Sequence, residues 1–557
     1  MVFMDKMRPW LSSYPEGVPT EINPSQYPSL KELLEHSFRE FAELPAFSNL
    51  GTTLNFAQVE QFSRYFAAYL QSATGLESGD RVAIMMPNLL QYPVVLFGIL
   101  RAGMIAVNVN PLYTARELEH QLNDSGARSI VVLENFASTL QPVLPATAIE
   151  TVIVTKVGDH FPFLKRVATN FVVKRIKKIV PPWAIQTAVS YLHALVAGKD
   201  LPYREVVLGS EDIAFLQYTG GTTGIAKGAM LTHRNIVSNV LQAAAWARPF
   251  IAEREGIVVT PLPLYHIFSL TANLFCFVEL GGHNILITNP RDLPSLIKEL
   301  KRGPFTYITG VNTLFAALLN SPAFASIDFS QLRVSMGGGM AVQSSVSDEW
   351  KALTGQSLTQ GYGLTETSPI VCANPLDNRA FNGSVGLPLP STEVIICDDD
   401  GAMLASNEVG EICVRGPQVM KGYWNQPEAT VEILSDDGWL KTGDIGRMDA
   451  QGFIYIEDRK KDLILVSGFN VYPNEIENVV VSHPDVLEAA VIGVPDQQTG
   501  EAVKLFAVKK DPVLTEAQLI EHCRENLTGY KIPREVIFRD ELPKTNVGKV
   551  LRRALRE

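Results

Sequence analysis

The stretch IAFLQYTGGTTGIAKG, residues 213–228, decides the fold class of this 557-residue chain. Its first six residues are mostly apolar, which is typical of a buried strand. The glycines and threonines that follow predict a loop whose backbone N–H groups can turn towards phosphate oxygens. A helix is expected to begin near Thr232, so the glycine loop is predicted to join a strand directly to a helix. This order favours an α/β fold with an anion site at the loop.

The residues of this loop are candidate phosphate ligands. Threonine hydroxyls add hydrogen-bond donors, and Lys227 supplies a positive charge. The loop is not a Walker A motif, because Lys227 follows Ala226 and no G-K-[ST] sequence occurs there. Taken alone, such a loop is more often a mobile turn than a phosphate site. The candidates are Tyr218, Thr219, Gly220, Gly221, Thr222, Thr223, Gly224 and Lys227.

Upstream of the loop, helical and strand patterns alternate. Apolar residues recur at helical spacing from Val59 to Tyr69, and apolar runs at 81–86, 104–109 and 129–133 are typical of buried strands. The sequence Thr114-x-x-Glu117 is a capping box that predicts a helix start. This alternation predicts a parallel sheet with helices on its faces.

The composition is that of a folded protein with a large core, since 46% of residues are hydrophobic and 19% are charged. With 48 Lys and Arg against 59 Asp and Glu, the net charge of −11 disfavours nucleic acid as a partner. The five cysteines form no C-x-x-C pair, which favours reduced thiols in the cytosol. Neither a signal peptide nor a clean apolar run of about 20 residues is present. We therefore expect a soluble, cytoplasmic protein.

Residues 161–198 differ from the rest of the chain. They contain no Asp or Glu, six Lys or Arg, and interleaved aromatic residues such as Phe163 and Phe171. This pattern resembles a basic amphipathic segment that lies on the cytoplasmic face of a membrane. The alternative is a solvated connector whose aromatic residues pack on the body of the protein.

Further glycine-rich motifs carry chemistry-bearing side chains. In GGGM (337–340) and QGYGLTET (360–367), glycines beside Tyr362 would let a planar base lie between backbone and ring. Thr365 offers a hydroxyl to a phosphate, and Glu366 offers a hard oxygen to Mg²⁺. A packed tyrosine at a tight turn is the alternative. The candidates here also include Gly338, Gly339, Met340, Gly361 and Gly363.

The remaining motifs lie near the C-terminus. GWLKTGD (438–444) places Asp444 at a turn, where a carboxylate suits a ribose diol, and Arg459 follows. PKTNVGKV (543–550) contains Lys549. The alternative for the first motif is a surface turn, and a lysine near a chain terminus is usually solvated and without a catalytic role.

Together, in this order, the motifs resemble the adenylate-forming enzymes, which include acyl-CoA synthetases, luciferases and peptide-synthetase adenylation domains. The resemblance runs from about Leu30 to Arg556, and residues 437–477 are similar to the fatty-acyl-CoA synthetase signature. PNLLQYP (87–93) and GYK (529–531) resemble the long-chain members. The implied fold has a large N-terminal α/β body of stacked sheets with helices (1–458). A hinge (459–462) and a small mobile α+β domain (463–557) follow.

The resemblance implies a two-step reaction: a fatty acid and Mg-ATP give acyl-AMP and pyrophosphate, and the acyl group then passes to CoA. The loop 219–227 would hold the β- and γ-phosphates. Tyr362 would stack on adenine, Thr365 would contact the α-phosphate, and Glu366 would bind Mg²⁺. Asp444 and Arg459 would hold the ribose. Lys549 would bridge the substrate carboxylate and the α-phosphate. His266 would border the acyl pocket, Lys461 would be the hinge, and Gly468 would lie along the CoA arm.

Departures and alternatives remain at this stage. Gly221 stands where many members have serine, and Ile267 stands where amino-acid activators have aspartate, which disfavours amino-acid substrates. We expect a long-chain fatty acid:CoA ligase. The alternatives are a ligase for medium-chain or aryl acids, an acyl-AMP ligase serving a carrier protein, a non-catalytic acyl- or nucleotide-binding protein, and a membrane-surface adaptor. The sequence leaves a homodimer open.

Overall fold

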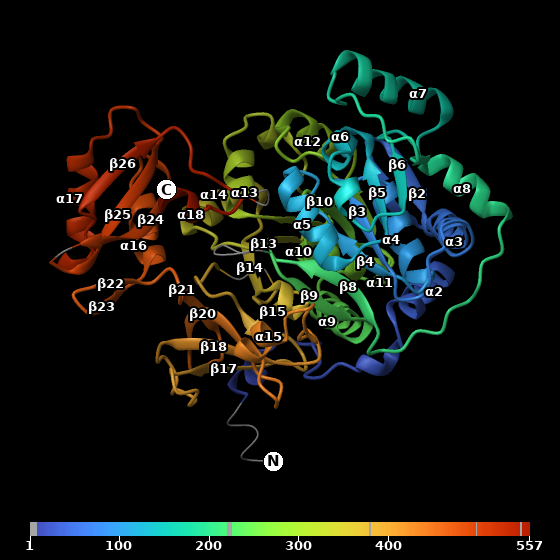
Figure 1. Cartoon of the computed structure of the whole chain (residues 1–557). Helices are drawn as coiled ribbons and strands as arrows, with labels where there is room; N and C mark the ends of the chain where they lie inside the picture. Colours follow the sequence, from blue (N-terminus) through green and yellow to red (C-terminus); the bar gives the residue numbers. More distant parts are fainter. Residues whose placement is uncertain (1–7, 220–225, 378–379, 497, 546–547, 557) are drawn as a thin grey trace.

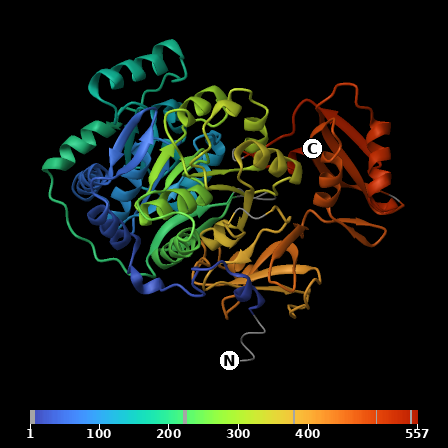
Figure 2. The same ribbon diagram turned by 180° about the vertical axis from the view of Figure 1, so that it is seen from behind.

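The computed structural model describes residues 8–219, 226–377, 380–496, 498–545 and 548–556 (Figure 1). A large body of sheets and helices is followed by a smaller C-terminal lobe, which both views place at one side of the body (Figures 1 and 2). The predicted fold class is confirmed.

The first sheet of the body has the strand order β19-β9-β8-β4-β3-β5-β6-β7. From β8 to β7 all neighbours are parallel, as the alternation predicts. Capping boxes at Thr114 and Thr232 open α5 and α9. The bounds are β3 Arg81–Met85, β4 Ile105–Asn108, α5 Ala115–Ser125, β5 Ser129–Leu133, β6 Thr151–Thr155, β7 Val189–Ser190, β8 Ile213–Tyr218, β9 Gly228–Thr232, α9 His233–Ala247 and β19 Gly422–Tyr423.

One detail of the glycine loop is wrong in the prediction. The loop does not join a strand directly to a helix, because β9 lies between them and pairs antiparallel with β8. Residues 228–232 are too short a run to show a strand period. Their pairing with β8 and β19 is a tertiary effect that overrides local pattern. The predicted helix start near Thr232 is confirmed, because α9 begins at His233 with Thr232 as its N-cap, but the strand β9 precedes it.

A second sheet has the order β16-β15-β14-β13-β12-β10-β11-β1-β2. Its strands β10 to β14 are parallel, and β13 and β14 end side by side at the glycines of the GGGM and QGYG motifs. The bounds are β1 Pro45–Asn49, β2 Thr52–Asn55, β10 Ile257–Thr260, β11 His283–Leu286, β12 Tyr307–Gly310, β13 Val334–Gly338, β14 Leu358–Gly363, β15 Ile370–Ala373 and β16 Leu387–Pro388.

Helices fill the space between these sheets. Every residue of α4 (Gln91–Arg101) is buried, and one apolar cluster joins α2 (Leu30–Glu40), α3 (Phe56–Ala73), α4 and α9 to strands of both sheets. A helix as apolar as α4, whose polar residues Gln91 and Arg101 lie at its two ends, is expected where it is covered on every side. The long apolar run that the sequence shows near residues 93–109 is thus a core helix and a core strand.

An antiparallel sheet and the C-terminal lobe complete the fold. The sheet is β17-β18-β20-β21, and the lobe has its own apolar core under β24 and β25. The bounds are β17 Glu393–Cys397, β18 Gly410–Arg415, α15 Pro427–Ile433, β20 Leu440–Met448, β21 Ile454–Arg459, β22 Ile464–Val466, β23 Phe469–Val471, α16 Pro473–Val481, β24 Val486–Asp496, β25 Gly500–Lys509, α17 Glu516–Asn526, β26 Glu535–Arg539 and α18 Arg553–Arg556.

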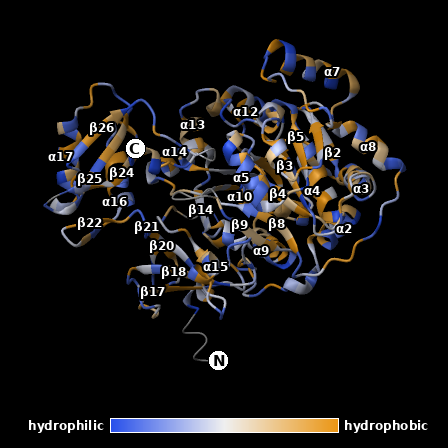
Figure 3. Cartoon of the chain, in the orientation of Figure 1, coloured by the Kyte–Doolittle hydropathy of each residue, from blue (hydrophilic) through white to orange (hydrophobic). Residues whose placement is uncertain are grey.

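The basic segment forms an excursion from the first sheet. It contains α7 (Phe163–Phe171), a π-helical turn (Val172–Ile176) and α8 (Tyr191–Asp200). Figure 3 shows apolar and polar residues mixed along α7 at the outer edge of the body. Within the described ranges, no helix is both long and apolar enough to cross a bilayer.

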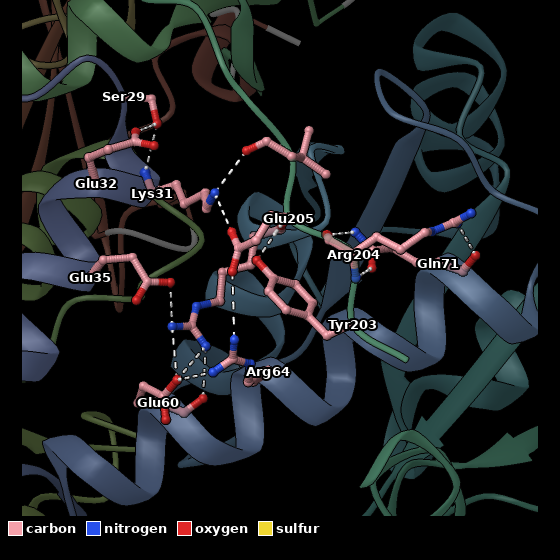
Figure 4. Close-up of polar contacts among 12 residues, drawn as sticks. Ser29, Lys31, Glu32, Glu35, Glu60, Arg64, Gln71, Tyr203, Arg204 and Glu205 are labelled. Carbon is pink, nitrogen blue, oxygen red and sulfur yellow. Dashed lines mark hydrogen bonds and ion pairs between the residues drawn. The ribbon is translucent and has the colours of Figure 1, made fainter. Parts of the chain in front are cut away.

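A polar network secures the return from this excursion to β8 (Figure 4). Lys31 Nζ donates to the Val206 carbonyl (2.8 Å) and lies 2.8 Å from Glu205 Oε2. The guanidinium of Arg101, only 1% exposed, donates to Glu35 and Glu60. Buried charges are tolerated when they are paired in this way. The contacts hold the connecting segment against α2 and α3.

Candidate active site

Several of the predicted site residues lie near the ends of β13 and β14. Gly339 follows β13 with φ of +78°, a conformation that glycine adopts without strain. A Cβ built on Gly339 would lie 3.4 Å from Lys549 Cε, which comes from the C-terminal lobe. Gly363 at the end of β14 lies so close to Pro369 that a Cβ there would meet its carbonyl oxygen at 1.9 Å. The glycines thus let other parts of the chain approach the strand ends closely.

Asp444 lies at this site with two partners. It faces Arg459 across the β20–β21 ladder, and Arg459 Nε lies 2.9 Å from Asp444 Oδ1. The Tyr362 hydroxyl donates to Asp444 Oδ2 (2.7 Å). Burial and the Asp444 charge raise the pKa of Tyr362 well above its usual value. Because each carboxylate oxygen can accept more than one hydrogen bond, Asp444 is held in place and still has acceptor capacity.

Glu366 belongs to a short 3₁₀ turn (Thr365–Thr367) directly after β14. Its Oε1 accepts a hydrogen bond from the Tyr423 hydroxyl (2.6 Å). Lys227, at the end of the glycine loop, places Nζ 5.0 Å from the centre of the same tyrosine ring. A cavity of about 380 Å³ opens beside Glu366 and Tyr423 and is also lined by Lys441 and Lys460. The structure thus brings the loop lysine and the 360–367 motif together through Tyr423.

One cation and two carboxylates act on Lys549, namely Arg459, Asp444 and Glu366. Burial, followed by the nearby Arg459 cation, lowers the pKa of Lys549 to about 8, while Asp444 and Glu366 act in the opposite direction. Two cations that face one space disfavour each other until an anion enters. Shifted pKa values of this kind cluster at functional sites.

His266 lies close enough to sense the Lys549 charge. Burial, and then Lys549, lowers the pKa of His266 to about 3, so the imidazole is neutral at pH 7. Its Nδ1 accepts from the Phe268 N–H (3.3 Å) as the N-cap of a short helix, Ile267–Ser269. The Phe268 ring lies against Gly338, where a Cβ would approach it to 2.9 Å. The apolar residues that follow are buried in the core, namely Leu270, Leu274, Phe275 and Phe277.

Other candidates lie elsewhere or outside the described residues. Gly220 to Gly224 are in the undescribed range, although Thr219 N donates to the Lys227 carbonyl (3.0 Å) and closes the loop. The Tyr218 hydroxyl donates to Asp124 Oδ2 (2.5 Å) rather than to a neighbour in the site. Met340 packs at the edge of a core cluster. Lys461 lies in the turn after β21.

Gly468 is not brought to the site in this pose. It occupies the exposed turn between β22 and β23, with φ of +83°. That hairpin projects away from the body in both views (Figures 1 and 2).

Sequence reasoning missed Tyr423. It lies in MKGYW (420–424), 57 residues after Glu366, and its local sequence carries no catalytic signature. A tyrosine next to a glycine is a weak sequence signal. Tyr423 is brought to the loop and to Glu366 only because β19 pairs with β9.

Comparisons with known proteins agree with this geometry. Residues 34–424 match the AMP-binding enzyme family, and residues 475–549 match the AMP-binding enzyme C-terminal domain. The chain therefore belongs to the AMP-binding enzymes. A long-chain-fatty-acid–CoA ligase of Salmonella typhimurium is 59% identical over 548 residues, which cover 98% of each chain.

Solved structures resemble the whole chain as well. ATP-bound MatB from Rhodopseudomonas palustris is 29% identical and superposes with a TM-score of 0.81, covering 94% of this chain and 98% of that one. Apo MatB, at the same identity and coverage, gives a TM-score of 0.72. The chain is thus more similar to the ATP-bound structure of that protein.

Proposed function

We propose that this chain is an AMP-forming ligase that activates long-chain fatty acids with ATP and transfers the acyl group to CoA. The observation that carries the proposal is the meeting of Lys549 with Arg459, Asp444 and Glu366 over Gly339. Binding alone would not require a lysine delivered to the strand ends by a separate lobe. The name of the 59% identical relative supports the choice of acid.

In the first step, a fatty-acid carboxylate oxygen attacks the α-phosphorus of ATP and pyrophosphate leaves. The two reactants are both anions, so a cation between them offsets their repulsion and stabilises the charge that grows at phosphorus. Lys549 has this role, with Thr365 contacting the α-phosphate. Asp444 and Arg459 hold the ribose hydroxyls, and the Tyr362 ring stacks on adenine while its hydroxyl fixes Asp444. Lys227 and its loop hold the outer phosphates.

The donor set suits a magnesium ion. Glu366 Oε1 accepts from the neutral Tyr423 hydroxyl (2.6 Å), and a carboxylate oxygen is a hard ligand of the kind that Mg²⁺ prefers. Glu366 would hold Mg²⁺, whose charge would offset that of the phosphates.

In the second step, the CoA thiolate attacks the acyl carbonyl carbon and AMP leaves. Lys549 lies at the site in this pose, whereas Gly468 lies on an exposed hairpin away from it. One placement of the lobe cannot serve both residues. We propose that the lobe turns about Lys461 between the two steps and brings Gly468 to the CoA arm.

Pyrophosphate release with Mg-ATP, across saturated acids from acetate to C18 and with or without CoA, tests the proposal. We expect CoA-stimulated turnover that is greatest between about C12 and C18, because each buried methylene adds about 0.8 kcal/mol. Preference for short or aryl acids would contradict the acid assignment. Acyl-AMP that accumulates without a CoA effect would indicate a carrier-protein acceptor. Absence of release with every acid would contradict the ligase.

A specific observation favours contact with a membrane as well. On α7, Phe163, Leu164, Val167 and Phe171 are all more than half exposed and form one stripe, with Leu164 at 80%. Exposed Lys174, Arg175, Lys177 and Lys178 follow on the adjoining turns. An apolar stripe beside basic residues, without an acidic residue in 161–198, complements an anionic lipid surface. We propose that α7 docks on such a surface.

Co-sedimentation with vesicles tests this contact. The double change Leu164→Glu and Phe171→Glu should abolish binding to vesicles that contain phosphatidylglycerol. Val513→Glu, at a 77% exposed apolar position of the C-terminal lobe, is the matched control and should leave binding intact. Undiminished binding of the double variant would refute the docking of α7.

A further inference from the structure

Asn474 is bonded across the segment that would form the hinge. It is the second residue of α16, and its backbone N–H donates to Asp458 Oδ2 (2.8 Å). Its side-chain Nδ2 donates to the Glu457 carbonyl (3.1 Å). Both acceptors lie on β21, before Lys461, whereas Asn474 follows it. A rotation of the lobe about Lys461 would break both bonds.

The same side chain reaches the segment that carries Lys549. Its Oδ1 accepts a hydrogen bond from Arg552 Nη2 (3.0 Å), three residues beyond Lys549. Arg552 also donates to Glu477 on α16 from Nη2 (2.9 Å to each carboxylate oxygen) and from Nε (3.3 Å), and it lies 3.5 Å from Asp462. The guanidinium is thus fixed from several sides, as its fork of donors allows.

The chain before Arg552 is a tight hairpin. Leu551 N donates to the Pro543 carbonyl (2.7 Å), and Thr545 N donates to the Lys549 carbonyl (2.7 Å). Lys549 lies on the second strand of this hairpin (residues 548–551, the lysine arm). Arg552 directly follows the lysine arm, so its fixed position holds one end of that arm in place. The amide of Asn474 therefore touches β21 through Nδ2 and, through Oδ1, the residue that ends the lysine arm.

We propose that Asn474 is a positioning residue that holds the C-terminal lobe in the pose that places Lys549 at the site. Its hydrogen bonds to β21 break when the lobe turns. The inference rests on the proposed function, since it assumes that Lys549 acts in the first step and that the lobe turns before the second. The side-chain bond that crosses the hinge, from Nδ2 to the Glu457 carbonyl, joins two uncharged groups, and such a bond is individually modest and breaks readily. β21 also carries Arg459, which pairs with Asp444. Asn474 therefore ties the lysine arm to the strand that helps to form the ribose site.

The test compares the two half-reactions in the full-length protein. Acyl-AMP formation is followed as pyrophosphate release in a single turnover without CoA, and thioester formation is followed from supplied acyl-AMP and CoA. Asn474→Ala loses both side-chain bonds, whereas Asn474→Asp keeps an acceptor for Arg552 and loses the donor to Glu457. Asn526→Ala is the matched control, because Asn526 Nδ2 also donates to a backbone carbonyl, but within its own helix (His522, 2.8 Å).

We expect both Asn474 variants to lower the rate of acyl-AMP formation about tenfold, the scale of losing one or two hydrogen bonds, with thioester formation unchanged or faster. The Asn526 control should change neither rate. Equal loss in both half-reactions would mean general damage to the lobe and would overturn the positioning role of Asn474. Wild-type rates in Asn474→Asp would overturn it as well. Failure of the proposed function would appear separately, as wild-type protein that forms no acyl-AMP.

Discussion

Asp444 and Lys549 meet at the same site but are held there in different ways. Asp444 lies within β20, which is paired on both sides by β18 and β21, and its carboxylate has fixed partners. Lys549 lies on a loop of the C-terminal lobe that is tied back by a hairpin, by Arg552 and by Asn474. The proposed ribose site is thus part of a sheet, whereas a few side-chain bonds hold the segment that carries the lysine.

Removal of the lysine should have the largest effect. Lys549→Ala should lower acyl-AMP formation by about 10²–10³-fold, since it removes the cation between two anions, while thioester formation from supplied acyl-AMP survives. Lys544→Ala is the control, because Lys544 is on the same hairpin but pairs with Glu488 (2.5 Å). Pyrophosphate release and thioester assays measure the two steps. Equal loss in both would refute the role of Lys549.

Stiffening the hinge should separate the steps in the opposite sense. Lys461→Pro fixes φ at this position, so we expect acyl-AMP formation near the wild-type rate and thioester formation at least about tenfold slower. The same two assays apply. An unchanged overall rate would show that the lobe does not turn about Lys461.

The pH dependence of acyl-AMP formation should follow the titration of Lys549 rather than that of the residues held in the sheet, such as Asp444. Lys549 acts as a cation, and its pKa is lowered to about 8 in the protein without substrates. The protonated fraction therefore falls as pH rises through 8, and kcat/KM for acyl-AMP formation should fall about tenfold per pH unit above it. A profile that stays flat to pH 10 would contradict a catalytic cation with this pKa. Thioester formation should lack this limb.

The smallest effect concerns the residue that sequence reasoning missed. Tyr423→Phe removes the hydroxyl that donates to Glu366 and keeps the ring beside Lys227. We expect a loss of about three- to tenfold in acyl-AMP formation, as for one hydrogen bond to a charged group. Because the bond orients a proposed magnesium ligand, raised Mg²⁺ should restore part of the rate. A loss that Mg²⁺ does not change would argue against this role.

Strands and caps could be predicted where the local pattern is strong. The parallel strands β3 to β5 follow from apolar runs, and the helix start at Thr114 follows from its capping box with Glu117. The strand β9 could not be predicted, because its few residues gain their conformation from pairing with β8 and β19. Tyr362 and Asp444 were predicted as ligands of one nucleotide, but their mutual hydrogen bond across 82 residues was not.

The sequence by itself determined the residue types of the site and their order: a glycine loop, a glutamate, an aspartate, an arginine and a late lysine. It determined the alternating pattern that forms parallel sheets as well. Only the tertiary structure decided that Tyr423 donates a hydrogen bond to Glu366, that burial and Arg459 lower the pKa of Lys549, and that Asn474 joins β21 to the lysine arm. The physical reason is range. Periodicity and capping act within a few residues, whereas electrostatic and hydrogen-bond partners 57 to 90 residues apart become neighbours only when the sheets and the lobe have packed.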